Sequence, residues 1–508
     1  MDLTQLIGRG FVKQAERTDA WTRNSDSLQR DVLRSLLERG RNTVYGRRYD
    51  FASVLRERDF ASAYRYRVPT VEYEEMRPLV MRMIRGEKDL LWPGRCRDFA
   101  QSSGTSGGKS KFIPITDASL SGNHYRGGSD AVAHYLRQVE GSRLFSGKAF
   151  ILGGSFANTL GLNIPGVHIG DLSATLIRRI NPAANYLRIP DKKTALLPDW
   201  ERKLPALVAA AKDADVTNIS GVPSWFLTVI RRIMEAKGVE KISDVWPNLE
   251  VFFHGGISFE PYRDEYKRIT DPEKMHFLET YNASEGFFAV QNDFSDRSML
   301  LIIDRDIFYE FIPVDGDDPT PVPLWEVKTG EVYELVISSS NGLWRYHLGD
   351  TVRVTQTSPV KIRIAGRTKS FINAFGEELM EDNAERAIAA ACDACGASIL
   401  NYTAAPLYAA RGRKGRHQWV IEWGNAPADI NVFADVLDKE LRRLNSDYDA
   451  KRNKSIFLDG PQVISARHGL FDDWLRSAGT HKLGGQRKVP RLSNDRHIID
   501  RLLELNKK

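Results

Sequence analysis

Apolar residues recur every three or four positions in two early stretches of the chain. In residues 27–41, one helical face collects five apolar residues, with charged residues opposite: Leu28, Val32, Leu33, Leu36 and Leu37. A stripe at this spacing is typical of an amphipathic helix that packs on a core. The pattern therefore predicts a helix over residues 27–41, and a similar pattern predicts a second helix over residues 74–85.

Farther along, short apolar runs alternate with longer amphipathic segments. The short runs predict buried strands at residues 149–152, 249–254 and 276–281. Residues 200–214 and 224–237 have the length and the apolar spacing of helices. Strands that alternate with helices predict an α/β layered domain.

Residues 299–354 differ because short strand-like runs follow one another without helices between them. The runs are residues 299–303, 308–312, 330–338 and 343–346. They predict an antiparallel or barrel-like portion joined to the α/β region.

A domain boundary is expected near Gly366 and Arg367, because a chain of 508 residues is too long for one simple core. Beyond this point helix and strand patterns alternate at residues 381–392, 418–423, 430–445 and 462–464. We therefore predict an α/β fold with a large N-terminal domain, residues 1–366, which includes the β-barrel-like portion. A smaller C-terminal α+β domain is expected over residues 367–508.

The composition is that of a globular protein and disfavours several classes. The net charge of +6 is a mild excess without the concentrated basic stripe that nucleic-acid binding requires. No N-terminal stretch resembles a signal peptide, and no stretch is apolar for long enough to cross a bilayer. Three cysteines are too few for a secreted disulfide framework, and Cys392 and Cys395 are interpreted as small buried helix residues. We expect a cytoplasmic protein that binds neither nucleic acid nor membrane.

The most specific motif is the Ser/Thr/Gly-rich loop of residues 102–110, which Lys111 follows. Backbone N–H groups next to glycines, hydroxyls and lysines are the groups that cradle phosphates. A Walker loop would need a glycine where Ser103 stands and would open a helix, whereas residues 112–116 have an extended pattern. We predict a phosphate-binding loop of another type, with a flexible surface loop as the alternative.

Three further motifs follow, each at the end of a predicted strand. Gly255 and Gly256 offer a bare backbone against which a flat ligand can lie. Residues 281–286 combine an aromatic ring for adenine, a hydroxyl for phosphate and a carboxylate for Mg²⁺. Asp350 can accept hydrogen bonds from ribose hydroxyls, although a carboxylate after a glycine also stabilises turns. The four motifs together predict a nucleotide site.

In this order the motifs resemble those of the acyl-acid amido synthetases. This family comprises the auxin-responsive, Gretchen Hagen type enzymes of plants and their bacterial relatives, within the adenylate-forming superfamily of acyl-CoA ligases and luciferase. Residues 102–106, Lys111 and Pro114 fall at the spacing of the family's nucleotide loop. Tyr281, Ser284 and Glu285 match the second motif, in which Asn282 and Ala283 are departures.

The resemblance continues to the end of the chain. Gly349 and Asp350 match the third motif, but His347 stands where the family has an arginine, so the role of that arginine is not carried over. Gly366-Arg367, residues 373–377 and residues 485–491 also match.

The resemblance implies a role for each matching residue. Ser102, Ser103, Thr105 and Lys111 would bind the phosphates, Ser284 would contact the α-phosphate, and Glu285 would hold Mg²⁺. Tyr281, Gly255 and Gly256 would face adenine, and Asp350 and Arg367 would bind ribose. Lys488, with Lys482 as the alternative, would be the mobile lysine that stabilises charge during adenylation. Lys488, Lys111 and Glu285 are thus the expected catalytic residues.

The resemblance further implies an ATP- and Mg²⁺-dependent ligase that converts a carboxylic acid into its acyl-adenylate. The acyl group would pass to an amine, an amino acid, after the C-terminal domain rotates about a hinge at Lys369. Two alternatives stay open: thioester formation with CoA or a carrier protein, and a nucleotide-binding regulator without catalysis. The particular acid and the oligomeric state are not indicated.

The acid is expected between the loop and the segments of residues 124–135 and 223–228. Four aromatic residues there would be its walls, with ordinary core packing as the alternative: Tyr125, Tyr135, Trp225 and Phe226.

Overall fold

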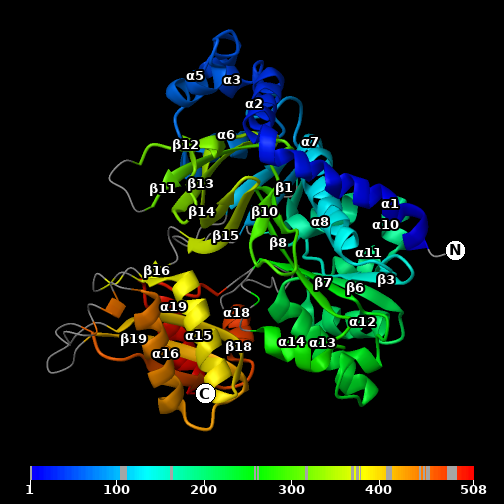
Figure 1. The fold of residues 1–508 in the computed structure, drawn as a ribbon, viewed down its shortest axis with the longest axis vertical. Coiled ribbons are helices and arrows are strands. Elements are labelled where there is room, and N and C mark those ends of the chain that lie inside the picture. The colour runs from blue at the N-terminus through cyan, green and yellow to red at the C-terminus, as the bar shows by residue number, and fades with distance from the viewer. Residues whose placement is uncertain are drawn as a thin grey trace.

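The computed structural model (Figure 1) describes residues 3–102, 111–158, 160, 164–256, 259, 262–314, 319–367, 371–372, 374, 377, 379–407, 415–445, 448–449, 452, 458–477 and 489–507. The side chains of residues 102, 200, 224, 366, 367 and 371 lie outside this description.

A single sheet organises the first three quarters of the chain. Within the described residues it has 12 strands, in the order β12-β11-β13-β14-β15-β10-β9-β8-β7-β6-β3-β5. In chain order these strands are β3 (Lys148–Ile151), β5 (Arg188–Ile189), β6 (Val216–Gly221), β7 (Val251–Gly255), β8 (His276–Ala283), β9 (Gly286–Gln291), β10 (Met299–Leu301), β11 (Ile307–Pro313), β12 (Val322–Pro323), β13 (Val332–Ser339), β14 (Leu343–Thr357) and β15 (Val360–Arg367).

The sheet has a parallel half and an antiparallel half that meet at β8. Strands β5, β3, β6, β7 and β8 pair in parallel, whereas β9 and the strands beyond it pair antiparallel. The strand-rich segment after residue 299 is therefore continuous with the α/β sheet. In open α/β sheets, ligands bind outside the carboxyl ends of the parallel strands. A site is therefore expected beside the carboxyl ends of the parallel half of this sheet.

Helices cover both faces of the parallel half. The alternation of β7 shows the two faces, because Phe252 packs in one buried cluster and its neighbours Val251 and Phe253 pack in the other. The helices of the N-terminal region are α1 (Leu3–Glu16), α2 (Trp21–Gly40), α3 (Val44–Arg48), α4 (Phe51–Val54), α5 (Phe60–Arg67), α6 (Tyr73–Ile84), α7 (Asp117–Ser119), α8 (Tyr125–Gln138), α9 (Leu172–Arg179), α10 (Pro182–Tyr186), α11 (Lys192–Ala195), α12 (Trp200–Ala211), α13 (Pro223–Lys237) and α14 (Arg263–Ile269).

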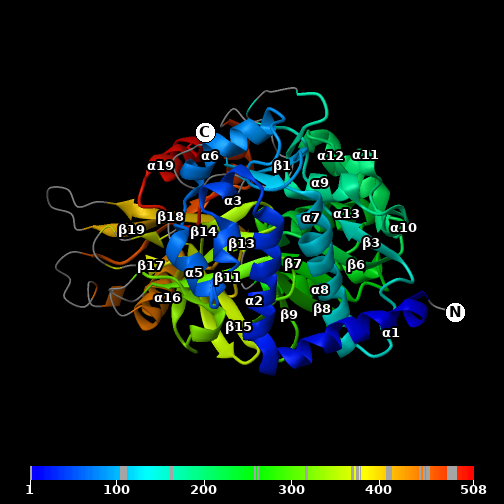
Figure 2. The same cartoon turned by 90° about the horizontal axis from the view of Figure 1, so that it is seen from above.

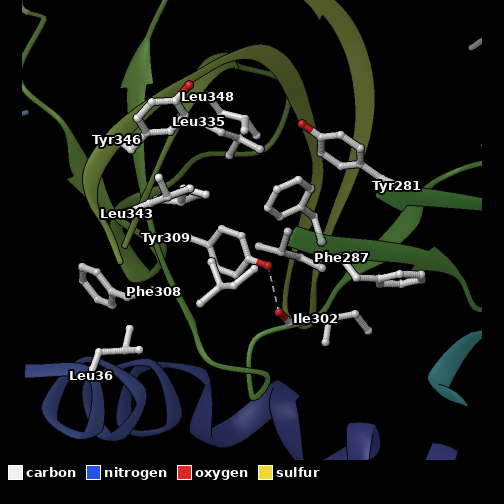
Figure 3. Close-up of a cluster of buried hydrophobic side chains, with 14 of the residues drawn as sticks. Leu36, Tyr281, Phe287, Ile302, Phe308, Tyr309, Leu335, Leu343, Tyr346 and Leu348 are labelled. Carbon is white, nitrogen blue, oxygen red and sulfur yellow. Dashed lines mark hydrogen bonds between the residues drawn. The ribbon is translucent and has the colours of Figure 1, made fainter. Parts of the chain in front are cut away.

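Helix α2 lies across the antiparallel half of the sheet (Figure 2). Figure 3 shows the core between them, in which Leu36 of α2 faces Phe308 and Leu343 of the sheet. The rings of Tyr281 and Tyr346 lie at the opposite end of this cluster from Leu36. The core thus includes Tyr281, which is a predicted nucleotide-site residue, and Tyr346.

Two smaller sheets are separate from the 12-stranded sheet, one in the N-terminal region and one between that region and the C-terminal residues. Strands β1 (Asp98–Ser102), β2 (Lys111–Ile115) and β4 (His168–Gly170) form a sheet in the order β2-β1-β4. Strands β16 (Phe371–Ile372) and β17 (Leu379–Met380) pair with each other.

The C-terminal residues form a separate layer (Figure 1, yellow to red). It contains the sheet β18 (Ser398–Leu407), β19 (Arg416–Asn425) and β20 (Gln462–Ala466), with helices α15 (Glu381–Cys395), α16 (Ile430–Leu444), α18 (Leu470–Ser477) and α19 (His497–Asn506). Two of the buried clusters take their residues from position 372 onward, and the other two take theirs from position 362 and before.

Most predicted elements agree with this fold to within a few residues, and two are shorter than the observed element. The helix expected over residues 27–41 lacks the first six residues of α2, and the run expected over residues 343–346 is only the start of the longer β14. The cysteine pair is on α15, where Cys392 is buried and both thiols are free. No described helix is long and apolar enough to cross a membrane.

Arg491 and Tyr262 connect the C-terminal layer to the start of helix α14. Arg491 Nη2 donates to Tyr262 Oη at 3.1 Å, and Tyr262 O–H donates to the carbonyl of Leu400 at 3.0 Å. Glu385 on α15 is only 6% exposed, and its Oε1 lies 3.7 Å from Arg491 Nε. Burial raises the pKa of Glu385 to about 7, and Arg491 opposes this effect.

This raised pKa predicts a pH-dependent stability. The folded chain keeps Glu385 protonated at pH values where the unfolded chain releases the proton, so its contribution, complete below about pH 4.5, is lost as the pH rises towards 7. The thermal midpoint of the wild type, relative to a Glu385→Gln variant, should therefore fall between pH 5 and pH 8. Parallel pH profiles for the two proteins would contradict the assignment.

Candidate active site

A cavity of about 1270 Å³ opens where the parallel strands end. It is lined by Gly255 at the end of β7, Gly256 after it, the turn between β8 and β9, Asp350 of β14 and Lys111 of β2. Residues of α15 and of the segment after residue 488 line it from the C-terminal layer. Several of the motifs that are far apart in sequence therefore meet at one place.

Ser284 and Glu285 form the two-residue turn of the β8–β9 hairpin. Both are buried, with Glu285 6% exposed, and both line the cavity. Asn341 Nδ2 donates to the backbone carbonyl of Glu285 at 2.8 Å. On the other side, Asn123 accepts from the N–H of Phe287 and donates to its carbonyl. Two asparagines thus fix the backbone of the turn that brings Glu285 to the cavity wall.

Tyr281 and Asp350 are joined directly. The Tyr281 O–H donates to Asp350 Oδ2 at 2.6 Å, and Asp350 is 7% exposed. Gly349, just before Asp350, has φ +79°, a conformation that favours glycine. Arg367 is the cross-strand neighbour of Asp350 in the β14–β15 pair, which brings the two predicted ribose residues together in backbone position.

Gly255 and Gly256 keep the floor of the cavity free of side chains. A Cβ at Gly255 would lie 2.3 Å from the carbonyl oxygen of Thr280 on the adjacent strand, so no larger residue fits. Gly256 has φ +83°. Their bare backbone beside Tyr281 matches the expected place of a flat ring.

Lys111 lies between two tyrosines at the start of β2. Its Nζ donates to Tyr346 Oη at 3.2 Å and lies 5.9 Å from the ring centre of Tyr73. Burial raises the pKa of Tyr346 well above its usual value, so its hydroxyl stays neutral beside the ammonium. Ser102 is the cross-strand partner of Lys111, and β1 and β2 therefore bring the two ends of the predicted phosphate loop together.

Five predicted residues lie outside the described part of the chain: the site residues Ser103, Thr105, Lys482 and Lys488, and the hinge residue Lys369. Val489, Pro490 and Arg491, which follow Lys488 in sequence, line the cavity.

Two of the four predicted aromatic walls do line the cavity, Tyr125 and Trp225. Tyr135 and Phe226 are instead core residues, a correction to their expected role as walls. Tyr135 packs edge-on against Phe253, and Phe226 packs against Phe150 and Phe252. Their faces of α8 and α13 point into the core, which aromatic content alone does not reveal.

The sequence motifs missed several residues that the fold brings to the cavity. Tyr73 of α6 supports Phe112 through a 2.7 Å bond from the Phe112 N–H to its hydroxyl. Glu334 of β13 lies 3.0 Å from His347 Nδ1, so the histidine that replaces the family's arginine has a carboxylate partner. The pairing of β13 with β14 explains this contact, and no local pattern indicates it.

The carboxylates present fit a Mg²⁺ ion that binds together with a nucleotide. Among the described residues, no group of three or more histidine, cysteine and carboxylate side chains is placed to hold a metal by itself. Mg²⁺ commonly binds through one or two carboxylates and the phosphates of its substrate. The buried Glu285, facing the cavity, suits that mode.

Removing the Tyr281 hydroxyl tests the nucleotide site that the sequence motifs predict, and it should weaken ATP binding there. In a Tyr281→Phe variant Asp350 loses the 2.6 Å hydrogen bond from the Tyr281 hydroxyl. A hydrogen bond contributes about 0.5–1.5 kcal/mol, so we expect the KM for ATP to rise about 2- to 10-fold with kcat little changed. Tyr333→Phe, which removes a hydroxyl bonded to Glu331 away from the cavity, is the control. Equal KM values for wild type and Tyr281→Phe would contradict this role.

The chain matches the models of one protein family and several named proteins. Models of the GH3 family N-terminal, central and C-terminal domains match residues 14–275, 300–367 and 382–497. The probable indole-3-acetic acid-amido synthetase GH3.1 of Arabidopsis thaliana is 24% identical, over 95% of this chain and 91% of its own length. The jasmonoyl–L-amino acid synthetase JAR4 of Nicotiana attenuata is 23% identical, over 67% of this chain and 68% of its own.

Solved structures show the same fold. The AtGH3.15 acyl acid amido synthetase in complex with 2,4-DB superposes with a TM-score of 0.77 at 21% identity, covering 98% of this chain and 96% of that one. A 2-hydroxyisobutyryl-CoA ligase in the postadenylation state gives 0.59 at 14% identity, covering 97% and 93%. The predicted family and fold class are thereby confirmed: the chain belongs to the GH3 family and shares the α/β fold of the adenylate-forming enzymes.

Proposed function

We propose that the chain is an AMP-forming acyl acid amido synthetase. It would use ATP and Mg²⁺ to activate a small carboxylic acid as its acyl-adenylate and would then transfer the acyl group to the amine of an amino acid. Its proposed location is the cytoplasm, where its free cysteines would persist.

One observation carries this proposal. The Tyr281–Asp350 pair, the Ser284–Glu285 turn, Lys111 and the Gly255–Gly256 backbone line one cavity, which continues between the sheet and α9 along apolar residues. A nucleotide and an acid can therefore lie side by side. Membership of the GH3 family, whose relatives named above are amido synthetases, supports the same reaction.

In the first half-reaction a carboxylate oxygen attacks the α-phosphorus of ATP. A new O–P bond forms, the bond from the α-phosphorus to the bridging oxygen breaks, and pyrophosphate leaves. The work of the protein is to align these atoms and to neutralise their negative charge. In our assignment Lys111 and the loop with Ser102, Ser103 and Thr105 bind the phosphates. Ser284 contacts the α-phosphate, and Asp350 and Arg367 hold the ribose.

Glu285 is the residue that would hold Mg²⁺, and the bound ion would neutralise phosphate charge. Other carboxylates also line the cavity, among them Glu279, Glu334 and Asp350, but none of these three lies on the turn beside Ser284.

In the second half-reaction the amine nitrogen attacks the acyl carbonyl carbon. The carbon–oxygen bond to AMP breaks, AMP leaves with the electron pair, and the nitrogen loses a proton to form the amide. We propose that residues 367–508 act as a mobile domain that brings Lys488 to the site for adenylation and moves it away for transfer. The position of Val489 and Pro490 on the cavity wall supports this role of the neighbouring lysine.

The test is product formation from a panel of carboxylic acids with ATP, offered amino acids, CoA or a carrier protein in separate reactions. Mass spectrometry of the products should find N-acyl amino acids, together with AMP and pyrophosphate. Thioesters in place of amides would establish an acyl-CoA or carrier-protein ligase. ATP binding without acid-dependent pyrophosphate release from any acid would establish a regulator.

A further inference from the structure

Two buried cations line the cavity away from the residues assigned to the nucleotide. Arg188 of β5 is 5% exposed and Lys203 of α12 is 1% exposed. A buried charge is costly unless an anion balances it. In the part of the chain that the structure describes, neither cation has a carboxylate within ion-pair distance, since their hydrogen bonds go to carbonyl oxygens and one amide.

Arg188 has a guanidinium nitrogen that no described residue accepts a hydrogen bond from. Its Nε donates to Asn185 Oδ1 at 3.0 Å and its Nη1 to the carbonyl of Pro190 at 2.7 Å. Its Nη2 is buried without a hydrogen-bond partner among the described residues. Burial lowers the pKa of Arg188, and the nearby Asp191 only opposes this effect.

Lys203 is held by two backbone carbonyls. Its Nζ donates to Gly153 at 2.6 Å and to Gly154 at 3.3 Å, which leaves the third N–H of the ammonium for another acceptor. Burial lowers the pKa of Lys203 to about 8, and Asp171 opposes this effect.

The two cations belong to an elongated lobe of the cavity. The lobe follows β3 from Gly153 back to Ala149, which is the cross-strand partner of Arg188. Four residues of strand span about 13 Å. Among the described lining residues from 124 to 256 there are arginine and lysine side chains but no aspartate or glutamate, and the acidic lining residues all come from elsewhere in the chain. The lining from this part of the chain therefore carries positive charge among mainly apolar residues.

We infer that the acid substrate carries a second anionic group, a distal carboxylate being the simplest, and that Arg188 binds it within this lobe while Lys203 adds to the positive charge. The inference rests on the proposed function, because it specifies the acid that the same site activates. The acid is favoured over the amino acid acceptor because the lobe lies along the β3–β5 edge of the sheet, while the C-terminal layer, with Glu381, Glu385 and Arg491, lines another part of the cavity.

The test compares unbranched dicarboxylic acids of four to twelve carbons with monocarboxylic acids of the same length. Binding to the full chain is measured by isothermal titration calorimetry, and pyrophosphate release is measured with ATP. For the best length, the diacid should bind about 10- to 100-fold more tightly than the monoacid, as expected for a charge-assisted contact.

Variants assign this preference to Arg188. Arg188→Met should reduce the ratio of the monoacid to the diacid dissociation constant to about one. Arg188→Lys should retain part of the preference for the diacid. Arg232→Met, which removes an exposed arginine of α13, is the control. Thermal melting of each variant shows that it is folded, and since Arg188 has no carboxylate partner we expect Arg188→Met to melt near the wild type. Equal binding of diacids and monoacids, or an unchanged preference in Arg188→Met, would overturn the inference.

Two further results distinguish a failure of the proposed function from a failure of the inference about Arg188. Diacid binding that depends on Arg188, without pyrophosphate release from any acid, would overturn the proposed function and leave this site standing. If Arg188→Met instead impairs transfer to an amino acid but not to its carboxamide, with acid binding unchanged, the lobe binds the carboxylate of the acceptor and the inference fails.

Discussion

Replacing Glu285 by glutamine should slow acid-dependent pyrophosphate release about 10- to 100-fold. The substitution keeps the shape of the side chain and removes its charge. Because Asn341 binds the backbone carbonyl of Glu285 rather than its carboxylate, the turn itself should persist. The estimate follows from the loss of one charge-assisted contact, which costs about 1.5–3 kcal/mol.

The dependence on Mg²⁺ makes this prediction specific. A variant that has lost a metal ligand should need a higher Mg²⁺ concentration for half-maximal rate, whereas general damage to the site would not shift this value. Glu235→Gln, which changes an exposed carboxylate on α13, is the matched control. Wild-type rates and an unchanged Mg²⁺ requirement in Glu285→Gln would remove Glu285 from the proposed mechanism.

Replacing Arg345 by alanine should destabilise the N-terminal domain by about 3 kcal/mol. Arg345 and Glu310 form a buried two-bond pair, Nε to Oε2 and Nη2 to Oε1, both at 2.8 Å. Removing one partner of a buried pair leaves an uncompensated charge, which costs about 3–5 kcal/mol. The lower end applies because Arg65 Nε, 3.5 Å from Glu310, still offsets part of that charge.

Arg345 also connects the chain before α6 to strand β14. Its Nη1 donates to the carbonyls of Arg65 and Val68, and its own carbonyl accepts from the N–H of Val71. Its φ of +46° is costly for a residue with a side chain, so these contacts maintain a strained position immediately before Tyr346.

Urea denaturation midpoints measure this effect. The double variant Arg345→Met with Glu310→Met should lose less stability than Arg345→Ala, because it removes both charges of the buried pair, while the part-exposed Arg65 keeps its contacts with Glu326 and the carbonyl of Pro321. Arg232→Ala at the surface should change stability by less than about 0.5 kcal/mol. A loss of similar size for Arg345→Ala and the surface variant would show that the buried pair contributes little.

The sequence predicted local elements well because each depends on nearby residues. Strand β7 and helix α13 follow directly from apolar spacing and end within two residues of the expected positions. The strand predicted over residues 343–346 stops short of Thr357 because Gly349 and Asp350 are typical of a turn, whereas pairing with β13 and β15 continues the strand through them.

The sequence predicts a residue of the site only where that residue belongs to a recognisable motif. Tyr281 and Asp350 are 69 positions apart, and family resemblance assigned both to one nucleotide site. Their contact results from the order of strands in the sheet and was not predicted. Glu334, Tyr73 and Arg188 belong to no motif. They reach the cavity through strand pairing and helix packing, which single-sequence patterns do not specify.

The most direct test of the account is a crystal structure of the chain with a non-hydrolysable acyl-adenylate analogue, an acyl-sulfamoyl adenosine. We expect the ribose hydroxyls to lie within hydrogen-bond distance of Asp350, the sulfamoyl group beside Ser284 and the acyl chain in the lobe along β3. An adenosine bound outside the cavity, in contact with none of Ser284, Glu285 and Asp350, would contradict the proposed site.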